Sequence, residues 1–272
     1  MTDADPFKAF EQAGWEGIPD AYHAGFGTLT TQCIGPLLDA VAAKRRTQLL
    51  DVASGPGYVA AEAVHRGCEA LGVDFAPAMV REASRRFPGI EYREGDAEAL
   101  SFPKESFDAV VINFGVLHLA RPDAAIAEAF RVLRPGGRLA FTVWALPERA
   151  VAFGIVLGAI RAKGNPDAPL PPGPPFFRFG DRAESEAALT QAGFTELKVM
   201  EVSQRWRLPS GEALFDIMRD GTVRTGGLLR AQTPAALAAI REAVIEAVKP
   251  YENGKGIELP MPAVLSSGLK PR

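Results

Sequence analysis

The sequence predicts an α/β protein built on a mostly parallel sheet. Three observations lead to this fold class: short apolar runs rich in strand formers, stretches of helical length between them, and a glycine turn that joins the first run to the first helix. Open sheets of this kind bind ligands beyond the carboxyl ends of their strands. The 272 residues suit one domain that can bury a core, and no repeat or second domain is visible.

The first strand and its turn are the most informative part of the chain. An apolar strand ends in the turn Ala53-Ser54-Gly55-Pro56-Gly57, and a helix is expected from Tyr58 to Arg66. Glycine lets the backbone turn sharply and approach a ligand because it has no Cβ. Gly55 to Ala60 also fits the dinucleotide fingerprint, so the turn alone leaves the nucleotide open. Asp51 favours a cationic ligand, since a carboxylate at the strand end repels a pyrophosphate.

A second strand, Leu71 to Phe75, ends in Asp74, 19 residues after Gly55. A carboxylate there can accept hydrogen bonds from both ribose hydroxyls of a nucleoside. NAD sites have the same feature, so Asp74 by itself does not identify the nucleotide. The alternative is a helix N-cap, with Pro77 at the start of the next helix, and the two roles are compatible.

Further elements follow in the same alternation. We expect, in order, a strand at 90–93, a strand at 107–112, a helix at 123–133, a stop at Pro135-Gly136-Gly137 and a fifth strand at 138–144. Beyond them we expect a helix from a capping box at Asp181 to Gly193, a long strand at 194–208, helices at 211–219 and 234–249, and a final strand at 256–269.

Four segments in register resemble class I S-adenosylmethionine (AdoMet)-dependent methyltransferases over roughly residues 45–145. The first motif reads Asp51-x-Ala53-x-Gly55-x-Gly57, with alanine where the family has its first glycine, and Asp74 follows in its strand. The third motif, Gly95 to Pro103, resembles the segment whose Asp holds the adenine amino group. The fourth motif is Leu133-Arg134-Pro135-Gly136-Gly137-Arg138-Leu139. Within class I the chain looks closest to the ubiquinone- and menaquinone-biosynthesis C-methyltransferases.

This resemblance implies a Rossmann-like seven-stranded sheet in the order 3-2-1-4-5-7-6, with the last strand antiparallel and helices on both faces. It implies AdoMet as methyl donor, S-adenosylhomocysteine (AdoHcy) as product and no metal. The cofactor contacts it implies are Tyr22, Asp51, Ala53, Ser54, Gly55, Gly57, Asp74, Phe75, Met79, Gly95, Asp96, Ala97, Glu98, Asn113, Phe114, Gly115 and His118.

The chain divides into a helical cap at 1–48, the AdoMet-binding core at 49–145, a substrate lid at 145–180 and a C-terminal part at 181–272. Two helices are expected in the cap, where Trp15, Ala21-Tyr22 and Phe26 match a helix that lies over the cofactor in related enzymes. Tyr22 is a catalytic candidate whose hydroxyl can face AdoMet, and its alternative is a core tyrosine. The proline-dense segment is a lid or a linker, and a lid would present Phe153, Phe176, Phe177 and Phe179.

The bulk properties exclude several classes. A net charge of −3 argues against a nucleic-acid substrate. Cys33 and Cys68 give neither metal spacing nor a disulfide framework, and the acidic start Met1 to Asp5 does not resemble a signal peptide, so we expect a cytoplasmic protein. The longest apolar run, Ala150 to Ile160, is too short for stable membrane insertion. A homodimer is compatible with the sequence.

The predicted function is methyl transfer from AdoMet to a small, apolar or aromatic molecule by in-line displacement. His118, just past the fourth strand, is the candidate base or cofactor contact; its alternative is a histidine bonded within its loop. His23 is a weaker candidate, and His65 is expected to face solvent. Two other functions remain open: an AdoMet- or AdoHcy-binding protein without turnover, and an NAD(P)-dependent oxidoreductase. The identity of the acceptor and its reacting atom stay open as well.

Overall fold

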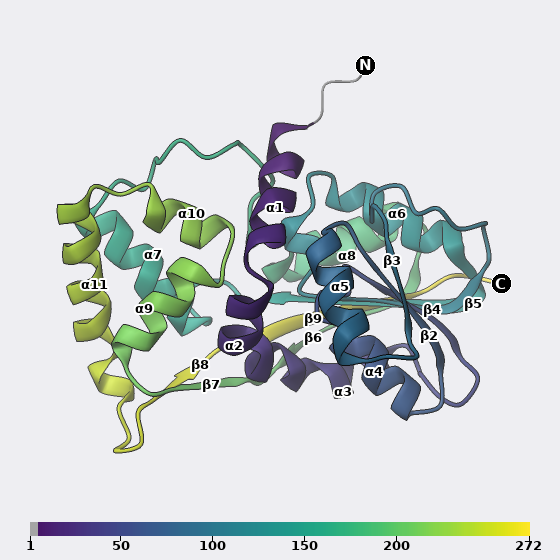
Figure 1. Ribbon diagram of the computed structural model, residues 1–272. Helices are drawn as coiled ribbons and strands as arrows, with labels where there is room; N and C mark the ends of the chain where they lie inside the picture. The colour runs from purple at the N-terminus through teal and green to yellow at the C-terminus, as the bar shows by residue number, and fades with distance from the viewer. Residues whose placement is uncertain (1–4) are drawn as a thin grey trace.

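A seven-stranded sheet forms the centre of the computed structural model, which describes residues 5–272 (Figure 1). Its strand order is β3-β2-β1-β4-β5-β9-β6. The pairs from β3 to β5 are parallel, and β9 is antiparallel to both β5 and β6. The strands are β1 (Gln48–Val52), β2 (Glu69–Asp74), β3 (Glu91–Glu94), β4 (Phe107–Asn113), β5 (Leu133–Trp144), β6 (Thr195–Val202) and β9 (Ala263–Leu269). The predicted fold class and strand order are confirmed, with β9 as the antiparallel strand.

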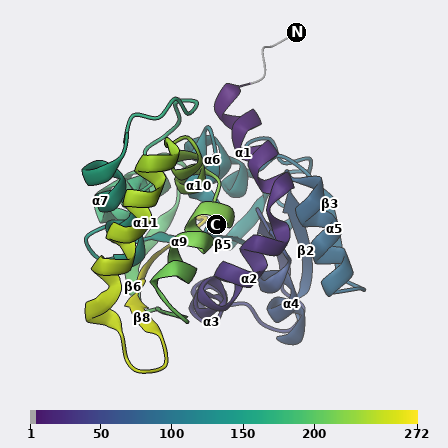
Figure 2. The same ribbon diagram turned by 60° about the vertical axis from the view of Figure 1, so that its left-hand side comes forward.

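Helices cover both faces of this sheet, with α3 and α4 on one face and α6 and α8 on the other (Figures 1 and 2). The central strands are therefore apolar on both sides: Leu49 and Leu50 in β1 and Val110 to Ile112 in β4 have no exposed surface. The helices are α1 (Pro6–Gly17), α2 (Pro19–Thr30), α3 (Ile34–Ala40), α4 (Tyr58–His65), α5 (Pro77–Arg86), α6 (Pro122–Val132), α7 (Val151–Lys163), α8 (Arg182–Gln191), α9 (Gly211–Asp220), α10 (Arg224–Arg230) and α11 (Pro234–Val248). Proline at the first turn fixes the starts of α1, α2, α5, α6 and α11.

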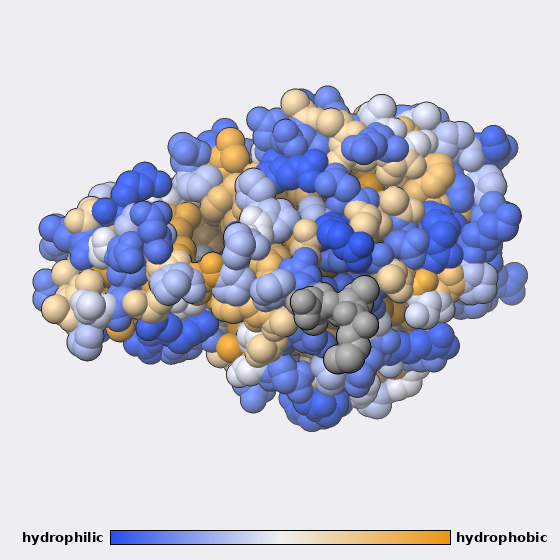
Figure 3. Space-filling view, turned by 90° about the horizontal axis from the view of Figure 1, so that it is seen from above, coloured by the Kyte–Doolittle hydropathy of each residue, from blue (hydrophilic) through white to orange (hydrophobic). Residues whose placement is uncertain are grey.

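Helices α7, α9, α10 and α11 pack on one another beside the sheet, on the left of Figure 1. Seen from above, hydrophobic residues show in a hollow between this helical group and the rest of the molecule (Figure 3). Helix α1 runs across the ends of the strands between the two parts (Figure 1).

Two predicted strands are each divided in the structure. The prediction of one long strand at 194–208 is wrong. Strand β6 ends at Val202, and β7 (Arg205–Leu208) forms a separate two-stranded antiparallel sheet with β8 (Ile257–Pro260). The buried side chains of Gln204 and Trp206 donate to the carbonyls of Leu29 and Gly25 in α2, so the chain leaves the main sheet to pack on that helix.

The final strand is divided for a local reason. Pro260 ends β8 and Pro262 precedes β9, and proline has no N–H to donate to a strand ladder.

Three smaller differences concern element boundaries. The N-terminal region has a third helix, α3, in addition to the two expected, and α10 was not expected. Strand β5 begins at Leu133, so the Pro135-Gly136-Gly137 segment is an irregularity within the strand pair rather than a stop before it. Gly136 has φ +83° there, and the irregularity lets Leu133 and Arg138 pair with β4 residues only two apart.

The prediction of a cytoplasmic location rests in part on the acidic start of the chain. Its residues Met1 to Ala4 lie outside the described residues.

Candidate functional site

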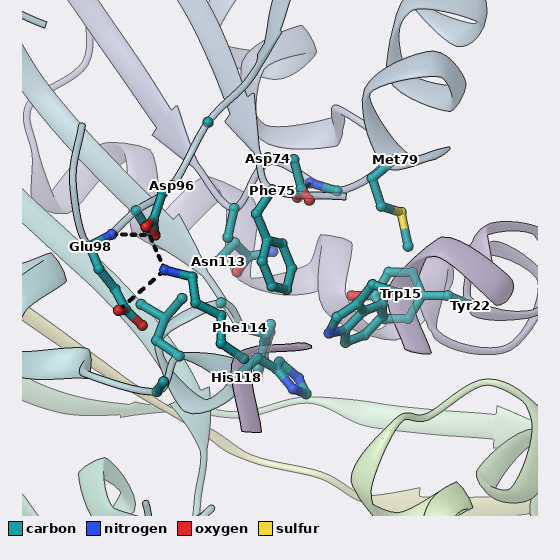
Figure 4. A pocket seen from close by; sticks show the side chains of 18 residues that line it. Trp15, Tyr22, Asp74, Phe75, Met79, Asp96, Glu98, Asn113, Phe114 and His118 are labelled. Atoms are coloured by element: carbon teal, nitrogen blue, oxygen red, sulfur yellow. Dashed lines mark hydrogen bonds and ion pairs between the residues drawn. The ribbon is translucent and has the colours of Figure 1, made fainter. Parts of the chain in front are cut away.

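A cavity lies at the carboxyl ends of β1, β2 and β4, under α1 and α2 (Figure 4). The space inside it, including the part that is open to solvent, is about 680 Å³. The predicted site residues that line it are Tyr22, Ala53, Gly55, Asp74, Phe75, Met79, Gly95, Asp96, Ala97, Glu98, Asn113, Phe114, Gly115 and His118. Lys8, Leu119 and Ala120 line it without having been predicted, and Trp15, expected only in the covering helix, lines it too.

The turn after β1 adopts the left-handed backbone that its glycines predict. Ala53, Gly55 and Gly57 have φ of +52°, +50° and +86°. Ala53 adopts this conformation although it is not glycine, so the alanine in the motif does not change the turn. A Cβ on Gly57 would lie 2.5 Å from Tyr92 Oη, which means that Gly57 is required for packing behind the cavity rather than on its surface.

Asp74 connects this turn to the next strand. It is 5% exposed, its Oδ2 accepts from the Gly55 amide at 2.8 Å, and its Oδ1 accepts from the Ala76 amide at 2.9 Å. Helix α5 has Ala76 as its N-cap and no side-chain cap, so the N-cap alternative for Asp74 is not what the structure has. Burial raises the pKa of Asp74 to about 6, although the backbone hydrogen bonds oppose that shift.

Asp51 and Ser54 lie behind the cavity lining. Asp51 is fully buried, and its Oδ2 accepts from the Ala60 amide in α4 at 3.1 Å. Within residues 5–272, Asp51 Oδ1 and Ser54 Oγ have no hydrogen-bond partner. Burial, with a contribution from the nearby Asp74 charge, raises the pKa of Asp51 to about 8.

Asp96 and Glu98 form a polar cluster at the end of the cavity with a residue that was not predicted (Figure 4). Lys8, on α1, forms an ion pair with Asp96 and lies 3.4 Å from Glu98 Oε2. Glu98 is nearly buried and also accepts from the backbone amide and Nε of Arg121, at 2.9 and 3.0 Å. Glu98 is thus held within the protein, whereas Asp96 is held on one side by the Glu98 amide and on the other by Lys8.

His118 ends a short turn after β4 and lies at the edge of the cavity next to Trp15 (Figure 4). Its ring packs edge-on against Trp15, with 4.8 Å between centroids, and against Phe176 at 5.6 Å. Its Nδ1 lies 3.0 Å from Oε2 of Glu11, a fully buried residue of α1. Sequence reasoning missed Glu11, because a single acid in a mixed polar helix is usually on the solvent side.

Tyr22 lies in the aromatic part of the cavity. Its ring stacks on Phe26, with 5.7 Å between centroids, and packs edge-on against Trp15 at 5.2 Å. Burial raises the pKa of Tyr22 to about 12, so its hydroxyl keeps its proton near neutral pH. Tyr22 can therefore donate a hydrogen bond, and it is not suited to act as a base.

The predicted lid segment meets the site through one aromatic residue. Phe176 packs on His118, and Phe153 and Phe177 pack on the ring of Phe176. Phe179 packs elsewhere, on Phe141 in β5. Phe176 and Phe177 also line a second, open groove that shares Ala120 with the cavity.

Two further properties bear on the class of site. In the part of the chain from Asp5 onwards, no cluster of three or more His, Cys, Asp or Glu side chains has the arrangement of a metal site. None of the helices described there is long and apolar enough to cross a bilayer.

Comparison with known proteins identifies the family. A family model described as a methyltransferase domain matches residues 50–141. A demethylmenaquinone methyltransferase of Renibacterium salmoninarum is 39% identical over 111 residues, which are 41% of this chain and 47% of the relative. One of Paenarthrobacter aurescens is 30% identical over 176 residues, which are 61% of this chain and 70% of the relative.

The similarity extends to the fold of a solved methyltransferase. The phosphoethanolamine N-methyltransferase 2 of Haemonchus contortus, solved with AdoMet, superposes with a TM-score of 0.54 at 17% identity, over 93% of this chain and 57% of that one. The chain spans about half the length of the first curated relatives it matches. Together with the strand order and the cavity at the strand ends, these matches show that the chain belongs to the AdoMet-dependent methyltransferase family.

Proposed function

We propose that this protein transfers the methyl group of AdoMet to a small, apolar or aromatic molecule. The observation that carries the proposal is the carboxylate of Asp74, which lines the cavity while it holds the Gly55 amide of the glycine turn. With Asp96 it makes the lining acidic, and Lys8, the cation in the described lining, is paired with Asp96. Such a site suits a cationic nucleoside better than a pyrophosphate.

The described residues fit AdoMet in three places. Asp74 has lone pairs left for the ribose hydroxyls, and Asp96 can accept from the adenine amino group where Lys8 now binds it. The bare backbone at Gly55 leaves room for the amino-acid end, because no atom lies within 4 Å of a Cβ placed there. When bound, AdoMet would supply an electrophilic methyl group on a sulfonium.

The acceptor side of the cavity is aromatic. Trp15, Tyr22, Phe114 and His118 line it, and Phe176 packs on His118 from the lid segment. Flat apolar molecules bury well between such rings. The relatives reported above are named for demethylmenaquinone, and we propose a quinol-like aromatic acceptor for this chain as well.

The chain contributes mainly alignment and exclusion of water. Orientation of donor and acceptor alone can supply about 7–11 kcal/mol in good cases. We assign His118 the role of base toward the acceptor and Tyr22 the role of a hydrogen-bond donor, since Tyr22 keeps its proton.

Ligand specificity is the first test of this function. AdoMet and AdoHcy should each raise the melting temperature of the protein, because a ligand that binds only the folded state stabilises it. NAD and NADP should leave it unchanged. A rise in melting temperature with NAD or NADP, and none with AdoMet, would favour an oxidoreductase instead. Calorimetric binding of AdoMet without transfer of labelled methyl to any phenol, naphthol or quinol would make it a non-catalytic AdoMet-binding protein.

The substitution Asp74→Ala should weaken AdoMet binding by about 1–3 kcal/mol, because two charge-assisted hydrogen bonds to the ribose are lost. Isothermal titration calorimetry measures the change. Glu94→Ala is the matched control, since Glu94 pairs with Asp74 in the sheet register and is exposed. Equal affinities for Asp74→Ala and the wild type would remove Asp74 from the ribose role.

The substitution Asp51→Asn should stabilise the unliganded protein increasingly as the pH rises. Folding raises the pKa of Asp51 from its usual value to about 8, so the folded state binds the proton more tightly and wild-type stability falls between about pH 4 and pH 8. Asparagine removes this loss, and the gain in unfolding free energy should reach the order of a few kcal/mol at pH 8.

Urea unfolding across this pH range provides the measurement for Asp51→Asn. The exposed Asp20→Asn change is the control, because folding does not bury that carboxyl. A gain that is the same at pH 4 and pH 8 would contradict the assignment of the effect to the buried charge.

The substitution His118→Asn should lower kcat for methyl transfer by about 100-fold or more, in keeping with the usual contribution of a general base. AdoMet affinity should change little. Labelled-methyl transfer to the most active phenol or quinol of the panel measures the rate. His65→Asn is the control, because the His65 side chain is 83% exposed. Full activity of His118→Asn would limit His118 to a packing role.

A further inference from the structure

Glu11 is a buried carboxylate of α1 whose position needs an explanation. Its side chain has no exposed surface, and within residues 5–272 its Oε1 has no hydrogen-bond partner. Burial of a carboxylate in this way costs several kcal/mol unless partners compensate it. Replacement of such a group by an apolar one of similar size is often neutral or stabilising, so stability alone does not account for Glu11.

The contacts of Glu11 converge on one oxygen atom. Oε2 accepts from Trp15 Nε1 at 3.1 Å and lies 3.0 Å from Nδ1 of His118, which is 107 residues further along the chain. Trp15 Nε1 is a donor only, so Oε2 acts as an acceptor there, and an accepting Oε2 pairs with a His118 Nδ1 that carries the hydrogen. In the neutral ring the unprotonated nitrogen is then Nε2, which has no partner among the described residues.

Arg224 is a cation whose charge interacts with that of Glu11. Burial lowers the pKa of the Arg224 guanidinium, and the charge of Glu11 opposes that shift. Arg224 lies over the rings of Phe7 and Phe176, with 5.0 and 5.4 Å to their centroids.

Helix α1 is fixed at several points that keep Glu11 in place. Gln12 Nε2 donates to the Phe75 carbonyl at 2.8 Å, and Glu16 accepts from the Ala78 amide at 2.7 Å and from Arg81 at 2.6 Å. One turn earlier, Lys8 binds Asp96. Residues three or four apart lie on one helix face, so one side of α1 rests on the loops after β2, β3 and β4.

We propose that Glu11 is a positioning residue that holds His118 with Nε2 unprotonated and free to accept the proton of an aromatic hydroxyl. This inference rests on the proposed function and names its acceptor class as phenols and similar acidic hydroxyl compounds. The hydroxyl proton passes to Nε2, the oxygen forms the new O–CH₃ bond, and the C–S bond breaks with its electron pair left on sulfur. The products are AdoHcy, a methyl ether and an imidazolium whose Nδ1–H stays on Glu11.

The tautomer of His118 in the unliganded protein tests the positioning role directly. The chain has three histidines, so ¹⁵N NMR of the imidazole rings is tractable, and His118→Asn assigns the signal. At mildly alkaline pH the wild type should show a protonated Nδ1 and an unprotonated Nε2. Glu11→Leu, which keeps the volume and removes the acceptor, should lose this preference. Asp20→Asn, which changes an exposed carboxyl on the neighbouring helix α2, is the control and should keep it.

A double-mutant cycle on methyl transfer tests the catalytic consequence. Glu11→Leu and the near-isosteric Glu11→Gln should each lower kcat by about 10-fold or more, with unchanged calorimetric affinity for AdoMet. In the His118→Asn background the same changes should have little further effect, because Glu11 acts through His118. Phenols should be methylated, and their matched methyl ethers should not.

Two results would overturn the inference: a wild-type His118 protonated at Nε2, or losses from Glu11 and His118 that simply add. The NMR result does not depend on an acceptor. Failure of the proposed function would appear separately, as absence of AdoMet binding with the tautomer intact.

Discussion

The hydrogen bond from the Gly55 amide to Asp74 Oδ2 is the contact on which the site depends. It joins the turn after β1 to the end of β2, and it forms because parallel neighbouring strands bring their carboxyl ends to the same edge of the sheet. The bond holds a turn in which Ala53 and Gly55 both have positive φ, so the backbone opens toward the cavity. The carboxylate that organises the turn is also one of the acidic groups in the cavity lining, so one side chain serves both the fold and the ligand chemistry.

Buried negative charge is a recurring feature of this molecule. Asp51, Asp74 and Glu11 are all buried, and each has either a raised pKa or an oxygen without a partner in the described residues. A protein selected only for stability would not retain such groups, because desolvation exceeds what their contacts return. In a site for a cationic donor and a proton-accepting histidine, the carboxyl groups of Asp74 and Glu11 have a use, because one lines the cavity and the other contacts His118.

The alternation of strands and helices could be predicted, because apolar runs, glycine and proline are local signals. One of the two divided strands is decided by distant packing. The strand expected at 194–208 is divided because Gln204 and Trp206 bond to carbonyls of α2, which no local pattern records. The break between β8 and β9 has a local cause instead, because Pro260 and Pro262 have no N–H to donate to a strand ladder.

The sequence by itself determined the family, the glycine turn and the position of most cavity residues, because these are encoded in short motifs at the ends of strands. It also placed His118 at the cavity edge. Only the tertiary structure decided that Lys8 binds Asp96 and that Glu11 faces His118. The two pairs join α1 to loops 88 and 107 residues away, and burial of a charged side chain depends on what packs over it rather than on its neighbours in the chain.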